Sequence, residues 1–452
     1  MRSVSSTVPI YNPRRIRTLA AMLRRAFTIA VGALCGSVVA FTVIHTAAGW
    51  GLWPNRELDR SSGYVRQVLE IVGENYVDAE KAAYSELTKS ALHGLLSSLD
   101  PHSDFLEAKQ YRELEEDMNA EFGGIGVQVE VRKEKVVVIA PIAGTPGDRA
   151  GIQRGDTIVA VDGQELGRAS MSDVISRLRG KPGTQVTVRL FRPSTQRDVE
   201  FRLEREVIRI ESVREARVLP GGIGYLQLAQ FSERTGEEFR DALGRLQAEG
   251  LRGLILDLRN NPGGVLDAAV EVAEPFFPAG ELIVYTQGRS PQDREEFRSR
   301  SRRLPIDEPV VVLINAGTAS AAEIVAGALK DTGRAVLVGE RSFGKGSVQS
   351  IFPLKNGEGL RLTTARYYTP SGVTIHQKGI DPQVESVMTP EDDARLRLQR
   401  SRSDVNDPAE FRERFGFAPI EDRQFATALE VMQGLLAWDR KHPAAPGTGG
   451  GR

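Results

Sequence analysis

The chain has 452 residues, of which 40% are hydrophobic and 26% are charged, with 45 Gly and 23 Pro. This is the composition of a folded protein with room for several cores, and it excludes a wholly disordered chain, a fibre and a disulfide-stapled miniprotein. The 59 basic and 60 acidic residues nearly cancel, so no overall basic field indicates nucleic acid binding. The one cysteine, Cys35, excludes an intrachain disulfide and a thiolate metal site. Because no histidines form an HExxH pair, we expect no catalytic metal.

The amino terminus differs from the rest of the chain in charge. Residues 1–25 carry six Arg and no acid, and residues 26–48 carry no charged side chain. As a helix the second segment would span about 34 Å, enough to cross a bilayer core. Because basic flanks stay cytoplasmic, we expect a single-pass anchor in the bacterial inner membrane, with the rest of the chain in the periplasm. A signal peptide cleaved after Thr46-Ala47-Ala48 is the alternative.

Three segments after the anchor differ in their hydrophobic pattern. Residues 57–118 place apolar side chains at helical spacing, which predicts an N-terminal helical region. Residues 121–206 carry alternating valines and turn glycines, which predicts a domain of short strands. In residues 211–389, continuous apolar runs alternate with helical periods, which is typical of an α/β sheet.

The carboxyl-terminal part of the chain carries no catalytic motif. Residues 390–440 are largely charged and helical by pattern, and dimerisation or partner binding are their candidate roles. Residues 441–452 are rich in Gly and Pro, which predicts a disordered tail.

A candidate nucleophile lies where a strand turns into a helix. Ser320 follows the apolar run Val310–Ile314 and opens a helical segment. In such a turn the hydroxyl is exposed, and the N–H of the next residue, Ala321, points at the oxyanion formed by its attack. Ser320 and Glu323 also fit an S-x-x-E capping box, in which the serine has a structural role only. The local sequence leaves both interpretations open.

A candidate base is Lys345, which lies between two glycines. Burial lowers the pKa of a lysine, to about 7 to 8 in catalytic sites, so that a neutral amine can accept the serine proton. The alternative is a flexible surface lysine in a Gly-rich hairpin. Gln349 could hold the amine through its carbonyl oxygen, but four residues span about 13 Å on a flat strand, so a bend or bulge is required. A Ser-His hydrolase that uses His376 is the rival interpretation.

Two glycine-rich turns are candidate binding elements. Gly263 and Gly264 follow a buried apolar run, so their amides could donate the second oxyanion hydrogen bond, or they could simply form a tight turn. Asp257 and Arg259, just before them, are expected to form a structural ion pair. The string Gly123–Gly126 resembles a nest of amides that binds the terminal carboxylate of a peptide, while the peptide adds as an edge strand.

Together these motifs resemble one family, the carboxyl-terminal processing peptidases or tail-specific proteases. The resemblance covers about residues 64–389, and the order and spacing of its motifs make it specific. It rests on Ser98–Ser103, Gly124–Gly126, Arg154–Ile158, Val161–Gly163, Asp257–Gly264, Ala319–Ala321, Phe343–Gly346 with Gln349, and Tyr367–Gly372.

The resemblance implies a serine endopeptidase that needs no cofactor. In the family the serine of the A-S-A string is the nucleophile, the lysine 25 residues later is the general base, and the glutamine four residues further positions it. These residues map to Ser320, Lys345 and Gln349. The implied architecture is an α/β core of crotonase-like fold at 211–389, with a PDZ domain inserted at 121–206.

The PDZ domain of the family recognises the carboxyl terminus of the substrate and gates the catalytic core. Residues 124–127 therefore inherit carboxylate binding, and Val129 inherits a side-chain pocket; the four are Gly124, Ile125, Gly126 and Val127. Arg179 is a candidate for coupling the PDZ position to the active site. The expected partners are proteins with accessible apolar tails, the lipid bilayer, a second copy of the chain and an adaptor or activator, but no nucleic acid. A non-catalytic adaptor that binds tails is the alternative function.

Overall fold

The computed structural model describes residues 56–132, 135–166, 171–402, 405 and 407–442. The predicted membrane segment at 26–48, the basic segment before it and residues 443–452 of the predicted tail lie outside the described residues. Within the described ranges, no helix is both long and apolar enough to span a membrane. The chain divides into two compact units, one ending at Leu92 and the other beginning at His93.

The first unit contains α2 (Arg56–Asn75) and most of α3 (Tyr84–Ser97). The predicted helical periods are confirmed, because Val65, Val68 and Val72 lie in α2 and Leu87 and Leu95 lie in α3. No residue of α2 is buried.

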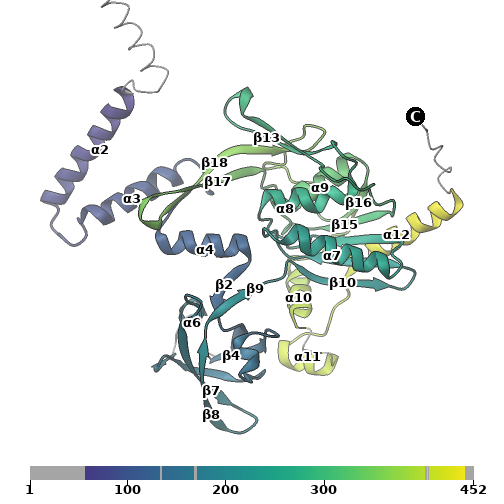
Figure 1. Cartoon of the computed structure of the whole chain (residues 1–452), viewed down its shortest axis with the longest axis horizontal. Coiled ribbons are helices and arrows are strands. Elements are labelled where there is room, and N and C mark those ends of the chain that lie inside the picture. Colours follow the sequence, from purple (N-terminus) through teal and green to yellow (C-terminus); the bar gives the residue numbers. More distant parts are fainter. Residues whose placement is uncertain (1–55, 133–134, 167–170, 403–404, 406, 443–452) are drawn as a thin grey trace, which may run out of the picture. The chain divides into compact units, whose positions relative to one another are not determined.

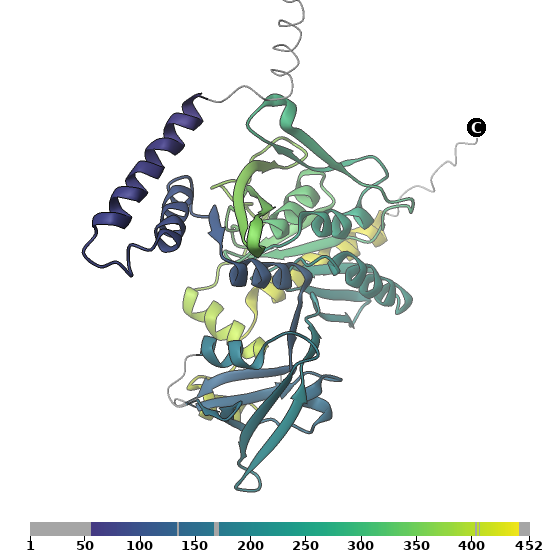
Figure 2. The same ribbon diagram turned by 60° about the vertical axis from the view of Figure 1, so that its left-hand side comes forward.

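An antiparallel sheet in the second unit forms the domain of short strands predicted from the valine pattern (Figure 2, blue to teal). Its order is β3-β4-β5-β7-β8, so β3 is an edge strand. Apolar side chains of the strands and of α6 form its core, among them Val138, Val174 and Val188. The elements are β3 (Val127–Arg132), β4 (Lys135–Pro141), α5 (Pro146–Arg149), β5 (Thr157–Val161), β6 (Gln164–Glu165), α6 (Met171–Leu178), β7 (Gln185–Arg192) and β8 (Arg197–Glu204).

This domain is inserted into the chain through a two-stranded ribbon. After α4 (Ala108–Asn119), strand β2 (Glu121–Gly124) enters the domain and pairs antiparallel with β9 (Glu206–Arg209), which leaves it. The Arg209 guanidinium donates to the Glu121 carboxylate across the ribbon at 2.8 Å. The domain therefore begins and ends at one point, as an inserted domain must.

The α/β core is a six-stranded sheet with helices on both faces (Figure 1). All neighbouring strands are parallel except the first pair, so the predicted α/β pattern is confirmed. Helices α7 (Thr235–Ala248), α8 (Leu266–Ala273) and α9 (Ala321–Asp331) cover one face. The sheet order is β10 (Val213–Leu219), β11 (Ile223–Leu228), β12 (Gly253–Asp257), β15 (Val310–Ile314), β16 (Ala335–Gly339) and β19 (Val384–Glu385).

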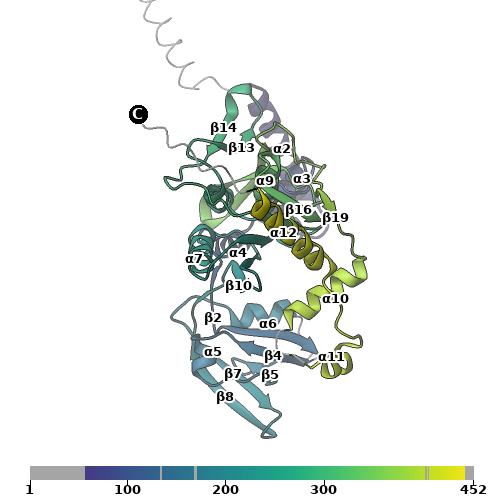
Figure 3. The ribbon, with the colours of Figure 1, turned by 90° about the vertical axis from the view of Figure 1, so that its right-hand side faces the viewer.

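The other face of this sheet is covered by α12 (Arg423–Lys441), as Figure 3 shows in yellow. Ala428, Met432 and Leu436 of α12 pack against strand residues that point away from the first three helices. Helices α10 (Pro390–Ser401) and α11 (Pro408–Phe415) precede it, so the predicted helical character of this region is confirmed. The packing of the core continues past residue 389, where the sequence analysis placed its end, because α12 supplies one of its two helical layers.

A second, antiparallel sheet lies beside the core. Its order is β1-β18-β13-β14, and β17 pairs with the opposite edge of β18. The apolar run 282–285 belongs to this sheet rather than to the parallel one. The elements are β1 (Asp104–Leu106), β13 (Leu282–Gln287), β14 (Arg294–Arg298), β17 (Ser347–Pro353) and β18 (Gly359–Tyr368). The loop before β17 carries Lys345, and β17 carries Gln349.

Candidate active site

Ser320 occupies the predicted turn between β15 and α9, in a conformation that is rare for a residue with a side chain. Its φ is +54° and its ψ is −118°, and strained backbone of this kind clusters at functional sites. The residue is buried, with 8% of its surface exposed. Its N–H donates to the Glu323 Oε2 at 2.8 Å, so the glutamate half of the predicted capping box is present. The capping interaction and the strained backbone therefore occur together in this turn, and Ser320 is buried rather than exposed as the sequence predicts.

The Glu323 carboxylate ties this turn to the loop that carries Lys345. It is fully buried, and its Oε2 accepts the backbone N–H of Ser320 and, at 2.9 Å, that of Lys345. Its Oε1 accepts the Ser342 hydroxyl at 2.5 Å and the Gly344 N–H at 2.7 Å. Burial raises the pKa of Glu323, and these four hydrogen bonds oppose that effect. The backbones of the candidate nucleophile and base thus meet at one oxygen atom.

Lys345 has the electrostatic environment of a candidate base. Burial lowers the pKa of its amine, and the Arg361 guanidinium lowers it further. Within the described residues, its Nζ forms no ion pair and no hydrogen bond, including none to the Ser320 hydroxyl. The structure therefore brings the two residues together through their backbones and leaves the amine unpaired.

Gln349 follows a bulge of the kind that the sequence required. The pairing of β17 with β18 shifts register between Val348 and Gln349. The Gln349 Nε2 donates to the Ser347 hydroxyl at 3.1 Å and to the Thr363 hydroxyl at 2.9 Å. Its Oε1 is buried and has no partner in the described structure. A buried amide oxygen without a donor is an available acceptor for an amine.

Two of the three predicted oxyanion donors are free. The N–H groups of Ala321 and Gly264 have no hydrogen-bond acceptor among the described residues. The Gly263 N–H, in contrast, donates to the Asn261 Oδ1 at 2.9 Å, so it is not available as predicted. A Cβ at Gly263 would lie only 2.7 Å from the Ser320 Cβ. Gly263 therefore allows the close approach of this loop to Ser320, and Gly264 is the better donor.

His376 lies next to the loop that carries Lys345. A Cβ added at Gly346 would lie 2.3 Å from the backbone nitrogen of His376, and the His376 Nδ1 is buried without a partner. Burial and the nearby Lys345 charge lower the pKa of His102, which also lies close to this loop. Neither histidine hydrogen-bonds to Ser320 in the described structure, so the rival base is present in the neighbourhood but not engaged.

The predicted carboxylate nest has free donors beside a free strand edge. The N–H groups of Ile125 and Gly126 have no acceptor among the described residues, and Gly126 has a φ of +71°. Val127 and Val129 of the edge strand β3 are half-buried against the core of the domain. Gly124 ends β2, so the nest connects the ribbon to this edge.

Arg179 contacts the ribbon that leads into the domain. Its guanidinium lies 4.1 Å from the centre of the Phe122 ring and 3.7 Å from the Glu116 carboxylate of α4. The N–H of the next residue, Gly180, donates to the Gly123 carbonyl. None of these contacts reaches Ser320 or Lys345.

The loop after β12 is held by partners that the sequence did not indicate. Asp257 and Arg259 form the predicted ion pair at 2.7 Å, and both are buried. Although burial opposes it, Arg259 lowers the pKa of Asp257. Asp422 also contacts Arg259, at 2.7 Å, and Arg400 contacts Asp257 at 3.0 Å. Because these partners come from the carboxyl-terminal helices, no local signal could have indicated them.

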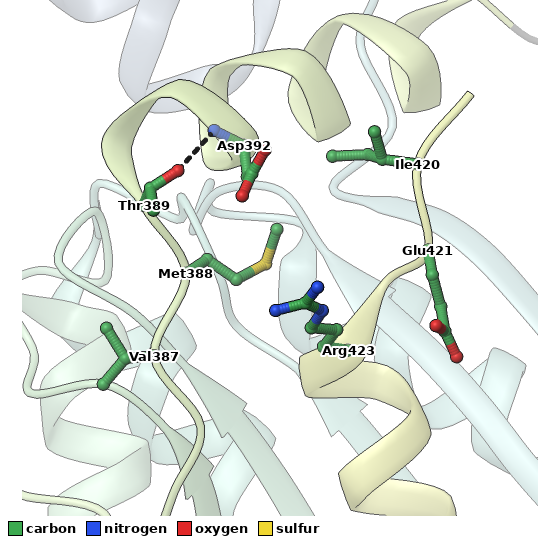
Figure 4. Close-up of a pocket in the computed structure, with 7 residues that line it drawn as sticks. All are labelled: Val387, Met388, Thr389, Asp392, Ile420, Glu421 and Arg423. Carbon is green, nitrogen blue, oxygen red and sulfur yellow. Dashed lines mark hydrogen bonds between the residues drawn. The ribbon is translucent and has the colours of Figure 1, made fainter. Parts of the chain in front are cut away.

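A cavity of about 270 Å³ lies between the starts of α10 and α12 (Figure 4). None of the candidate catalytic residues lines it. The lining residues are Val387, Met388, Thr389, Asp392, Ile420, Glu421 and Arg423.

Comparisons with known proteins match the order of these parts. Residues 222–386 match Peptidase family S41, and residues 137–192 match a PDZ domain. The chain is 40% identical over 303 residues to a carboxy-terminal-processing protease of Bartonella bacilliformis, an alignment that covers 66% of this chain and 69% of that protein. It is 35% identical over 436 residues to a carboxyl-terminal-processing protease of Synechocystis sp., covering 93% and 95%. A solved structure named photosystem II D1 C-terminal processing protease is 32% identical, covers 71% of this chain and 92% of that chain, and has a TM-score of 0.42.

Proposed function

Because this chain belongs to the carboxyl-terminal processing proteases of peptidase family S41, we propose that it cleaves protein substrates with a Ser320–Lys345 dyad. The family, the PDZ domain and the serine-type hydrolase activity predicted from the motifs are confirmed. The sheet with helices on both faces is consistent with a crotonase-like core. The observation that supports the dyad most strongly is the Glu323 carboxylate, whose Oε2 accepts the N–H of both residues.

In the proposed acylation step, the neutral Lys345 amine accepts the proton of the Ser320 hydroxyl while the Ser320 Oγ attacks the scissile carbonyl carbon. The N–H groups of Ala321 and Gly264 stabilise the oxyanion. The Lys345 ammonium then gives its proton to the leaving amine, the peptide C–N bond breaks, and an acyl-enzyme ester remains. Ser320 and Lys345 do not hydrogen-bond in the structure, and hydrogen bonds between catalytic groups often tighten only when substrate binds.

In the proposed deacylation step, Lys345 accepts a proton from water while the water oxygen attacks the ester carbonyl. Collapse of the second tetrahedral intermediate breaks the bond to the Ser320 Oγ, which recovers its proton from Lys345. The new carboxyl end leaves, and the dyad returns to its starting state. The cycle needs no cofactor.

We assign the choice of substrate to the nest of the PDZ domain. The free N–H groups of Ile125 and Gly126, with Gly124 beside them, would bind the terminal carboxylate of a tail. The tail would add along the free edge of β3, with its apolar side chains against Val127 and Val129.

A protein substrate with a free tail carboxylate should be cleaved at least about tenfold faster, in kcat/KM, than the same substrate with a tail amide, because the amide loses a charge-assisted hydrogen bond. Mass spectrometry of the new carboxyl ends measures the cleavage. Equal kcat/KM values for the two substrates would show that the nest does not select the substrate. Tail binding without any new carboxyl end would instead support the non-catalytic adaptor.

We also propose that residues 26–48 anchor the protease in the inner membrane, with the catalytic part in the periplasm, on the strength of their length and the preceding arginines. The full chain should then stay in the membrane fraction after alkaline carbonate washing, and a chain lacking residues 1–48 should be soluble. Intact-mass measurement provides the control. A mature chain that starts after Ala48 would replace the anchor by a cleaved signal peptide.

A further inference from the structure

A turn that the proposed mechanism does not use is linked to Gln349 through Thr363. This turn, Asp100–Ser103, belongs to one of the motifs that carry the family resemblance, and it leads into β1 on the edge of β18. The Asp100 carboxylate accepts the backbone N–H of His102 at 2.8 Å and that of Ser103 at 2.9 Å. It also accepts the Ser103 hydroxyl at 2.7 Å. The turn is therefore built around one carboxylate.

Thr363 of β18 joins this carboxylate to Gln349. Its N–H donates to the Ser103 hydroxyl at 3.1 Å, and that hydroxyl donates to Asp100. The Thr363 hydroxyl accepts the Gln349 Nε2 at 2.9 Å. Although burial works to raise it, these hydrogen bonds lower the pKa of Asp100, so this group is a carboxylate at neutral pH.

The Asp100 carboxylate fixes the direction of the hydrogen bonds that run from this turn to Gln349. An ionised carboxylate only accepts, so the Ser103 hydroxyl gives its single proton to Asp100 and accepts the Thr363 N–H, which holds Thr363 in place. The Thr363 hydroxyl accepts from Gln349, which presents the NH₂ end of its amide. This leaves the Gln349 Oε1 on the other side, where it is buried and without a partner.

We propose that Asp100 and Thr363 are positioning residues for the catalytic base, because they fix the Gln349 amide with its Oε1 available to the Lys345 amine. An acceptor at this place binds an N–H of the amine and leaves the lone pair free for the Ser320 proton. With the amide reversed, its NH₂ group would compete for that lone pair. The inference rests on the proposed dyad and extends it by two residues that lie outside the glycine-rich loop.

The test compares four variants of the full chain on one tail-bearing protein substrate. Asp100→Asn and Thr363→Val are expected to lower kcat by about 10 to 100-fold with little change in KM, because a misplaced base slows chemistry rather than binding. Both should also shift the pH at which kcat rises. Thr363→Ser should restore most of the kcat, since it keeps the hydroxyl. Thr364→Val is the matched control, because Thr364 is the next residue of β18 and its exposed hydroxyl contacts Ser350 instead.

Full kcat in both Asp100→Asn and Thr363→Val would overturn the inference. An equal loss of kcat in Thr363→Ser or Thr364→Val would also overturn it, because the effect would then be one of sheet structure. If Asp100→Asn does not fold, the comparison of Thr363→Val with Thr363→Ser tests the inference without it. Lys345→Ala distinguishes failure of the proposed dyad from failure of this inference. An active Lys345→Ala variant would refute the dyad. An inactive Lys345→Ala variant together with a fully active Thr363→Val variant would refute only the positioning role of Asp100 and Thr363.

Discussion

Lys345→Ala should lower kcat by about 10² to 10⁴-fold, the range that a general base contributes, and His376→Ala should retain most of the wild-type activity. The lysine amine is unpaired, and the N–H of its residue shares an acceptor with Ser320. His376 contacts the neighbouring Gly346 and does not hydrogen-bond to Ser320. Steady-state kinetics on a protein substrate measure both variants. The reverse ranking of the two variants would make His376 the base.

The pH dependence of kcat/KM provides an independent check on the same base. Burial and the Arg361 charge lower the pKa of Lys345, so kcat/KM should rise with pH through an apparent pKa below 10.5, the ordinary value for lysine. Arg361→Gln removes one of the two causes and should move this rise to higher pH. A rise that stays in place in Arg361→Gln but disappears in His376→Ala would assign it to the histidine.

Local sequence was sufficient to predict the backbone features of the candidate site, because each candidate group lies in a short motif with its own backbone requirement. The strand before Ser320, the glycines around Lys345 and the bulge that Gln349 needs could all be predicted from neighbouring residues, and the structure contains each of them. Their roles in the reaction stay predictions. The availability of the Gly263 amide was predicted wrongly, because the side chain two residues earlier accepts its proton.

Contacts between segments far apart in the sequence could not be predicted from local patterns. An apolar run such as 282–285 shows that a strand is buried but not which sheet it joins, and this one joins the antiparallel sheet. The apolar residues of α12 indicate that one of its faces is buried but not which element it packs against. In the structure α12 covers one face of the parallel sheet. The contact of Thr363 with Ser103 joins residues that are 260 positions apart. The parts of the site that hold its reacting groups in place are of this long-range kind.

Glu323→Gln is expected to lower both kcat and stability, because the new amide has one acceptor oxygen where the carboxylate has two. Each carboxylate oxygen accepts two donors, so the NH₂ group would face two donors that it cannot accept. Each of these two buried unsatisfied donors costs about 1 to 3 kcal/mol, so the free energy of unfolding should fall by about 2 to 6 kcal/mol. We expect kcat to fall by about 10²-fold, because the backbones of Ser320 and Lys345 lose their common acceptor.

A matched variant separates the loss of stability from the loss of positioning. Glu340 also accepts a backbone N–H, that of Met388, and the side chain of Gln424, but it does not contact Ser320 or Lys345. Both donors share the Glu340 Oε1, so Glu340→Ala removes their acceptor and should lower the free energy of unfolding while kcat stays near the wild-type value. If both variants lost kcat in proportion to stability, Glu323 would have no specific role in the site.

The pH dependence of stability adds a second signature for Glu323. Because its pKa is raised above 4.5 in the folded state, the folded protein binds this proton more tightly than the unfolded chain does. This contribution to stability is complete below pH 4.5 and is lost as the pH rises through the folded-state pKa. Glu323→Gln has no such proton, so its free energy of unfolding should fall less over that interval than that of the wild type. Denaturant unfolding at a series of pH values measures the difference, and parallel curves would mean that the carboxylate is equally acidic in both states.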